Sequence, residues 1–204
     1  SYPPIVASGE NACILHYTEN NQELKDGDLI LIDAGCEING YASDITRTFP
    51  INGKFSEPQR EIYEVVLNAQ KSAINSIKPG VSSNKPHETA CQIITDGLIK
   101  LGIMKSPEDL SKFYMHNTGH WLGLDVHDVG SKLVNDEFRE FKSGMVTTVE
   151  PGIYIRRDDK IDSKYWGIGI RIEDDVLVTE TGNRVLSNKA VKDINEIEHL
   201  MSQR

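Results

Sequence analysis

The sequence predicts an α+β domain with a curved antiparallel sheet and helices outside it. Three observations support this fold class: a strand pair joined by an Asn-Gly turn in residues 29–49, two amphipathic helix patterns in residues 56–101, and further strand patterns in residues 145–178. Strands that are spread through a chain with helices between them are typical of α+β domains. No linker, repeat or low-complexity segment interrupts the sequence, so we expect residues 1–204 to belong to one domain.

The strand pair comes first along the chain. Residues 29–35 form a continuous apolar run that ends in an acid, which is typical of a buried strand, and Tyr41–Phe49 is the second candidate. Between them, Asn39-Gly40 is the dipeptide that most readily supplies the two positive φ values of a type I′ turn. We therefore expect an antiparallel hairpin, in which a two-residue loop places Asp33 opposite Thr46 and Gly35 opposite Asp44.

This register puts Asp33 and Asp44 on one face as diagonal neighbours, about 7 Å apart at the backbone. Two carboxylates that reach toward each other at this spacing could hold a pair of cations roughly 3.5–4 Å apart. The alternative is that both are solvated residues on an open sheet face. Asp33 argues against this alternative because it follows Leu-Ile-Leu-Ile, and a buried carboxylate is costly unless it is paired or bound to metal.

Two helices are expected next. Ser56 and Gln59 form a capping box that opens an amphipathic helix, and Pro79-Gly80 ends it. A second helix is expected over about 86–101.

The last third of the chain returns to strands. Met145–Val149 and Ile168–Val178 are the candidates, Asn183 is expected to lie in a turn, and a C-terminal helix pattern follows. Within Ile168–Val178, alternate positions are isoleucine, while Arg171 and Glu173 share the opposite face. This strand alone leaves open whether that face is a functional inner surface or a solvated Arg-Glu pair.

Glu150 and three histidines complete the candidate ligands. His116, His120 and His127 lie within twelve residues, although any single histidine is more often structural than catalytic. His116 and His120 have the i, i+4 spacing of the zincin motif, but Asn117 stands where that motif needs its glutamate, so we exclude a zincin. A set rich in carboxylates favours manganese or cobalt over a structural zinc.

The bulk composition excludes other classes. The net charge of −9, with 22 Lys and Arg against 31 Asp and Glu, argues against a nucleic-acid partner. Cys13, Cys36 and Cys91 are too far apart for a disulfide framework or a CxxC zinc site, which favours a reducing compartment. No apolar stretch approaches the roughly 20 residues that cross a bilayer.

Taken together, these residues resemble the pita-bread metallopeptidases, the family that includes methionine aminopeptidase, aminopeptidase P, prolidase and creatinase. The resemblance covers nearly the whole chain. It rests on Leu-His16-Tyr, Ile-Asp33-Ala-Gly, Ser-Asp44-Ile-Thr-Arg-Thr-Phe, Gly-His120-Trp-Leu-Gly-Leu-Asp-Val-His127-Asp, Val-Glu150-Pro-Gly-Ile-Tyr and Gly-Ile-Arg171-Ile-Glu173-Asp.

The resemblance implies a dinuclear metal site and gives roles to its residues. Asp33 would chelate one ion, Asp44 and Glu173 would bridge both, and His120 with Glu150 would complete the other. Glu150 is also the candidate for moving a proton to the leaving amine. The remaining implied residues bind substrate, shuttle protons or orient a ligand carboxylate: His16, His116, His127, Tyr154 and Arg171.

Within the family, His127-Asp128 and the Glu-Pro-Gly-Ile-Tyr segment are most similar to the aminopeptidase P branch, and in particular to its mitochondrial, intermediate-cleaving type. The resemblance implies an aminopeptidase that releases a single N-terminal residue from peptides or proteins. Its expected cofactor is two Mn²⁺ ions, with Co²⁺ or Zn²⁺ as alternatives. A Xaa-Pro dipeptidase (prolidase) is the alternative enzyme, and a catalytically inactive pita-bread binding module is the alternative of another class.

The resemblance also sets expectations for the rest of the protein. The family's catalytic domain has helices and a strand upstream of the position of Ser1, and a separate domain before them. Without these parts, we expect the chain to expose the apolar surface on which they pack. We further expect a homo-oligomer in the full-length protein and a mitochondrial location, with the cytoplasm or nucleus as alternatives.

Overall fold

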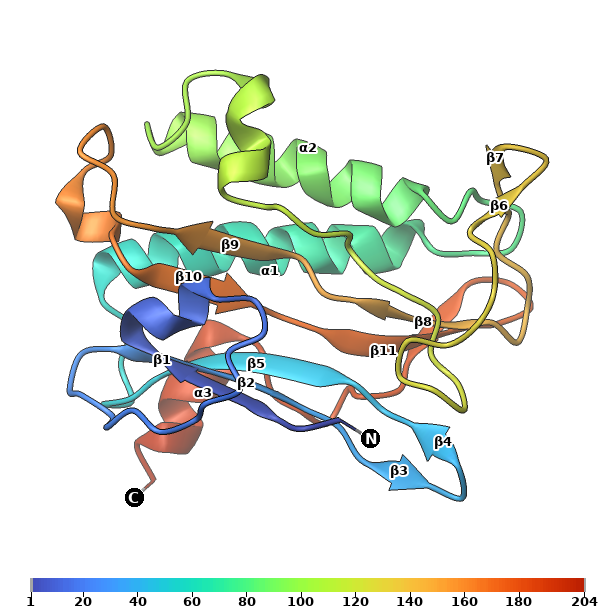
Figure 1. Cartoon of the computed structure of the whole chain (residues 1–204), viewed down its shortest axis with the longest axis horizontal. Helices are drawn as coiled ribbons and strands as arrows, with labels where there is room; N and C mark the ends of the chain where they lie inside the picture. Colours follow the sequence, from blue (N-terminus) through green and yellow to red (C-terminus); the bar gives the residue numbers. More distant parts are fainter. Residues whose placement is uncertain (1, 204) are drawn as a thin grey trace.

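The structure, a computed structural model, describes residues 2–203. Two long helices, α1 (Glu57–Ser76) and α2 (Lys85–Lys100), lie on one side of a layer of strands, and α1 packs between α2 and strands β8, β9 and β10 (Figure 1). A third helix, α3 (Ile194–Met201), follows near the C-terminus. Among the described residues, no helix is long and apolar enough to span a membrane.

All the strand pairs of the described residues are antiparallel, as the sequence predicts. One sheet has the order β1 (Ile5–Ser8), β2 (Leu29–Ala34), β5 (Ile45–Pro50), and another has the order β12 (Asn183–Val185), β11 (Asp174–Val178), β8 (Val146–Val149). Three further antiparallel pairs are β9 (Gly152–Ile155) with β10 (Ile168–Arg171), β3 (Glu37–Ile38) with β4 (Tyr41–Ala42), and β6 (Leu133–Val134) with β7 (Glu137–Phe138). Hydrogen bonds also join β5 to the β10–β11 segment, because Glu173 N donates to Thr46 O at 3.0 Å and Thr48 Oγ1 donates to Arg171 O at 3.0 Å.

The structure confirms the register of the Asn39-Gly40 hairpin. Both residues have positive φ, 54° and 83°, as a type I′ turn requires. Ile38 pairs with Tyr41 next to the turn, and Asp33 pairs with Thr46 further along the ladder. Asp33 and Asp44 therefore share a face of the hairpin.

The predicted strand Ile168–Val178 is broken in the middle, which the alternating pattern did not indicate. Arg171 pairs with Gly152 in one ladder and Asp174 pairs with Val149 in the other. The register on both sides of the break is the same, so Glu173 lies opposite Glu150. Within the break Ile172 N still donates to Pro151 O at 3.3 Å, but Pro151 has no N–H with which to complete the ladder.

The helices form as their caps and apolar faces predict. Ser56 N donates to Gln59 Oε1 at 2.9 Å, which is the reciprocal bond of the capping box. Fully buried residues of α1, α2 and β10 form one hydrophobic core, among them Ile62, Val66, Ile94, Leu98 and Ile170.

One prediction of local structure was wrong, and five strands were not predicted. Strand β1 is short, β9 directly follows a Pro-Gly pair that indicated a turn, and β6, β7 and β12 have only two or three residues each. Asn183 begins β12 instead of lying in the turn, which closes just before it when Thr179 N donates to Gly182 O. The Asn183 side chain instead donates to Ile74 O and Ile77 O at the end of α1.

Gly169 permits a close approach of the chain at β10. A Cβ at this position would lie 2.3 Å from the carbonyl oxygen of Ala12, which belongs to the 3₁₀ turn η1 (Gly9–Cys13). Only a glycine fits here, and the contact places the segment that follows η1, including His16, beside the strands.

Candidate metal centre

A cavity of about 340 Å³ collects the predicted site residues from five separate parts of the chain. It is lined by all of them except Tyr154: His16, Asp33, Asp44, His116, His120, His127, Glu150, Arg171 and Glu173. Leu15, Asn117, Gly119 and Lys132 complete the lining.

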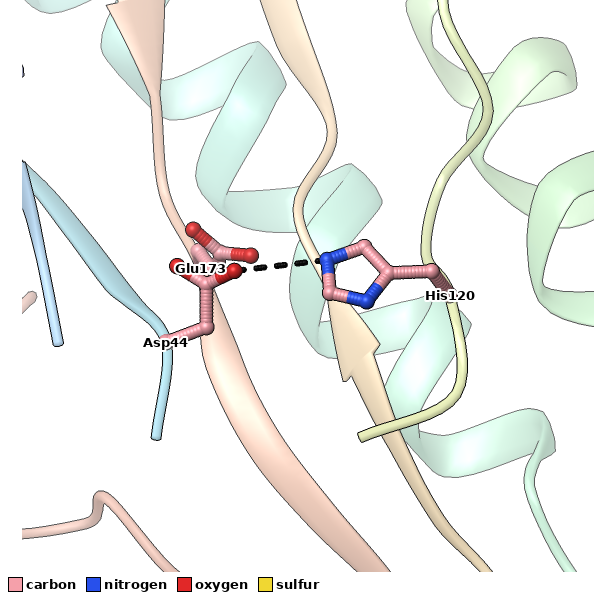
Figure 2. A group of neighbouring side chains, drawn as sticks. All are labelled: Asp44, His120 and Glu173. Carbon is pink, nitrogen blue, oxygen red and sulfur yellow. Dashed lines mark ion pairs between the residues drawn. The ribbon is translucent and has the colours of Figure 1, made fainter. Parts of the chain in front are cut away.

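Asp44, His120 and Glu173 form the tightest cluster. One ligand atom from each lies within 4.8 Å of the other two (Figure 2). His120 Nε2 is 3.3 Å from Asp44 Oδ2 and 3.5 Å from Glu150 Oε1, which brings a fourth ligand candidate to the same place.

Each member of this cluster sits where regular strand structure stops. Asp44 immediately precedes β5, and Glu173 lies in the break between β10 and β11. His120 lies on an extended segment beside β8, held there because Thr148 N donates to the His120 carbonyl at 3.0 Å. The flanking strands fix the backbone at these positions, and the three side chains line the cavity.

Asp33 is held by two partners. Arg171 Nη2 donates to Asp33 Oδ2 at 2.7 Å, and both side chains are largely buried. Tyr2 donates its hydroxyl to Asp33 Oδ1 at 2.5 Å and also contacts Asp44 Oδ1. Since one hydroxyl reaches both aspartates, their carboxylates lie side by side, as the hairpin register predicts.

Tyr154 does not line the cavity, because it is fully buried behind His116 and Arg171. Its hydroxyl lies 2.8 Å from His116 Nε2 and 3.1 Å from Arg171 Nη1. His116 Nδ1 lies 2.8 Å from Asn117 O, so both ring nitrogens have partners and the imidazole orientation is fixed.

Burial and mutual repulsion raise the pKa values of two glutamates. Burial raises the pKa of Glu150 to about 7, although the charges of His120 and Arg171 oppose the shift. Burial, followed by the charges of Glu150, Asp44 and Asp33, raises the pKa of Glu173 well above its usual range.

The pKa values of His116 and His120 shift in opposite directions. Burial lowers the pKa of His116 to about 4, which keeps this ring neutral. Burial opposes the charged form of His120 as well, but the carboxylates of Asp44 and Glu150 outweigh it and raise its pKa.

These residues fit a divalent cation. Four carboxylates in one small cavity repel one another, and without a cation three of them, Asp33, Glu150 and Glu173, are held toward their protonated forms. Divalent ions would neutralise this charge, and oxygen donors with one imidazole suit Mn²⁺ or a similar ion.

Sequence reasoning missed three polar residues of the site. Tyr2 lies in the first residues of the chain, where the sequence offers no motif for it. Thr46 donates to Glu173 Oε2 at 2.6 Å, and its position opposite Asp33 in the predicted register could have identified it. Lys132, in a polar loop, carries no pattern that distinguishes it from a solvated lysine.

The comparisons with known sequences agree with one another on the family of this chain. The model of metallopeptidase family M24 matches residues 1–180. The chain is 57% identical to the Xaa-Pro aminopeptidase of Haemophilus influenzae over 99% of this chain and 48% of that protein. It is 44% identical to the mitochondrial intermediate cleaving peptidase 55 of Arabidopsis thaliana, over 99% of this chain and 40% of that protein.

Solved structures show the same fold. The aminopeptidase PepP of Pseudomonas aeruginosa superimposes with a TM-score of 0.96 at 54% identity, over 99% of this chain and 48% of that one. This likeness confirms the predicted pita-bread fold. The chain spans about half the length of the curated relatives it matches.

Proposed function

The chain belongs to metallopeptidase family M24, and from that premise we propose that it forms the catalytic part of a Xaa-Pro type aminopeptidase that releases one N-terminal residue. The observation that carries this proposal is the cavity in which Asp44, His120 and Glu173 converge with Asp33 and Glu150. The relatives named Xaa-Pro aminopeptidase support the substrate class.

In this proposal Asp33, Asp44, His120, Glu150 and Glu173 hold two divalent ions, with Mn²⁺ as the expected ion and Co²⁺ or Zn²⁺ as alternatives. When bound, the ions would supply an activated water and polarise the scissile carbonyl. The chain's own contribution is to fix the ligands. Arg171 orients Asp33 and Thr46 orients Glu173, each through a hydrogen bond of less than 3 Å.

Glu150 is placed to move protons. Its carboxyl group lines the cavity beside His120, and in this proposal it takes a proton from the attacking water and gives it to the leaving amine. Thr148 Oγ1 donates to Glu150 Oε1 at 3.2 Å and limits the rotation of the carboxylate.

The histidines divide into one fixed ring and two that face the substrate space. His116 stays neutral and is held by Asn117 O and the Tyr154 hydroxyl, so it shapes the cavity wall. His16 and His127 line the same cavity, and we assign to them contacts with the peptide beyond the cleaved bond. Tyr154 acts through His116 and Arg171 because it does not reach the cavity.

The further proposal of a role in trimming imported mitochondrial proteins, with a mitochondrial location, rests on the relative from Arabidopsis thaliana. Relatives from bacteria share as much or more identity, so the trimming role depends on direct measurement of specificity.

The test is mass spectrometry of the products formed by the manganese-loaded protein from three substrates: a Xaa-Pro dipeptide, a Xaa-Pro decapeptide and a decapeptide that begins Tyr-Ser. Loss of one residue from the Xaa-Pro decapeptide is expected, and cleavage of the Tyr-Ser peptide would favour presequence trimming. The Glu150→Gln variant, which keeps the shape of the side chain, is the matched inactive control. Cleavage of the dipeptide alone would mean a prolidase, and no cleavage with metal bound would refute the enzymatic proposal.

A further inference from the structure

The active-site cavity adjoins a second cavity of about 310 Å³, which we call the side cavity. The two share the wall formed by Asn117, Gly119, His120 and Lys132. The side cavity lies against the start of α2, where Ser83, Asn84 and His87 line it. The two cavities therefore adjoin, and Lys132 lines both of them.

Lys132 is the cation in that wall. Its Nζ donates to the Gly119 carbonyl at 2.8 Å, and among residues 2–203 no carboxylate lies within ion-pairing distance of it. The side chain is half-buried, and desolvation lowers the pKa of its ammonium group, with the charge of Glu150 opposing the shift. A half-buried ammonium with one neutral partner is a position at which an anion binds favourably.

The backbone holds Lys132 in this position. Arg139 N donates to the Lys132 carbonyl at 2.9 Å, at the base of the β6–β7 hairpin. Ser131 Oγ accepts from Leu133 N and donates to Leu133 O, which fixes the bend next to it. The lysine is therefore presented by an ordered hairpin.

The other groups that line the side cavity also favour the binding of an anion. Within the described part of the chain, none of its lining residues is Asp or Glu, whereas hydroxyl, amide and imidazole groups are present. A carboxylate there would meet hydrogen-bond donors and a cation, with no carboxylate in the lining of the side cavity to repel it.

We propose that Lys132 and the side cavity form a subsite for a carboxylate of the peptide substrate on the C-terminal side of the cleaved bond. Resting on the function proposed above, the subsite takes either the terminal carboxylate of a short peptide or an acidic side chain of a longer one. Lys132 thus makes the enzyme select substrates by negative charge close to the cleaved bond.

Two matched substrate pairs test this subsite with the manganese-loaded protein. The first is a Xaa-Pro-Ala tripeptide with a free carboxylate against the same peptide amidated. The second is a pair of amidated Xaa-Pro decapeptides with Glu or Gln at the third residue. We expect kcat/KM to be higher for the charged member of at least one pair by about ten-fold, mainly through KM, since such a factor corresponds to one partly desolvated ion pair.

The two pairs separate the two sources of the carboxylate. A preference within the tripeptides assigns the subsite to peptide C-termini, and a preference within the decapeptides assigns it to acidic side chains. Equal kcat/KM within both pairs, with all peptides cleaved, overturns the subsite but leaves the proposed function intact. Failure to cleave any of them is the outcome that refutes the proposed function instead.

Three variants test whether Lys132 causes the preference for the charged substrates. Lys132→Met should abolish it, because the variant lacks the ammonium, and Lys132→Arg should retain most of it. Lys142→Met removes the same charge from an exposed position in the same segment and should leave the preference unchanged. A preference that survives in Lys132→Met, or that is lost equally in Lys142→Met, overturns the assignment.

Discussion

At the scale of single residues, the centre depends on partners that prepare each ligand for a cation. Arg171 and Tyr2 hold Asp33, Thr46 holds Glu173, and His120 faces Asp44. The two glutamates that face each other across the strand break have raised pKa values, so they carry protons that a metal ion must displace.

Manganese affinity should therefore depend on pH. The pKa of Glu150 is raised to about 7 in the folded, metal-free protein, so this carboxyl is mostly neutral below pH 7 and mostly charged above it. Protons compete with the metal on the acidic side, and we expect affinity to rise as pH increases from 6 to 8. Isothermal titration calorimetry at pH 6, 7 and 8 measures this, and a constant affinity would show that no ligand titrates in that range.

Arg171→Met should destabilise the fold strongly. The Arg171–Asp33 pair is buried, with side-chain exposures of 4% and 12%, and removing one partner leaves the other charge uncompensated. We expect a loss of about 3–5 kcal/mol in the free energy of unfolding, together with weaker metal binding. Urea unfolding measures the change in the free energy of unfolding, and calorimetry measures the change in metal binding.

Arg60→Met is the control for that substitution. Arg60 pairs with Glu198 at 2.7 Å, but the side chains are 34% and 23% exposed and lie outside the cavity. Such a pair contributes at most about 1 kcal/mol. An equal loss in the two variants would argue against a special role for Arg171.

At the scale of elements, the hairpin β2–β5 determines where the two aspartates meet. Its register was predictable because Asn39-Gly40 allows one tight turn and the alternation of side chains fixes the face. The break between β10 and β11 was not predictable, since the isoleucine alternation continues through it. That break lies opposite Pro151, a residue far away in sequence that has no N–H to donate to the ladder.

Two glycines of this hairpin should respond differently to substitution by alanine. Gly40 has φ of 83° with only ordinary contacts nearby, so Gly40→Ala should cost about 1–2 kcal/mol of stability and leave metal binding intact. At Gly35, a Cβ would lie 1.8 Å from the Ser43 carbonyl oxygen, so Gly35→Ala must displace the backbone between Asp33 and Asp44. We expect manganese affinity to fall in Gly35→Ala alone, and equal affinities in the two variants would contradict the geometry.

At the scale of the whole molecule, distant segments join behind the metal centre. Arg47 donates to the carbonyls of Thr46 and Glu173 and pairs with the buried Asp174, which also binds Lys192. This network ties β5 to β11 and the C-terminal segment. The motifs of the sequence predicted the candidate ligands, but such long-range partners, like Tyr2, carry no local pattern and become visible only in the fold.

The carboxylates of the centre oppose folding unless a cation is present, so metal should stabilise the protein. A ligand that binds only the folded state at 100 times its Kd adds about 2.7 kcal/mol. We expect Tm to rise as manganese is added to the metal-free protein and to return to its starting value with excess chelator. Differential scanning calorimetry would contradict this if manganese left Tm unchanged.

The central claim, that five residues hold two ions, is tested most directly by counting manganese ions per chain with native mass spectrometry. We predict two ions in the wild-type protein and fewer than two in Glu173→Ala, with circular dichroism showing that the variant stays folded. Two ions retained by Glu173→Ala, or no tightly bound manganese in the wild type, would contradict the assignment of the site.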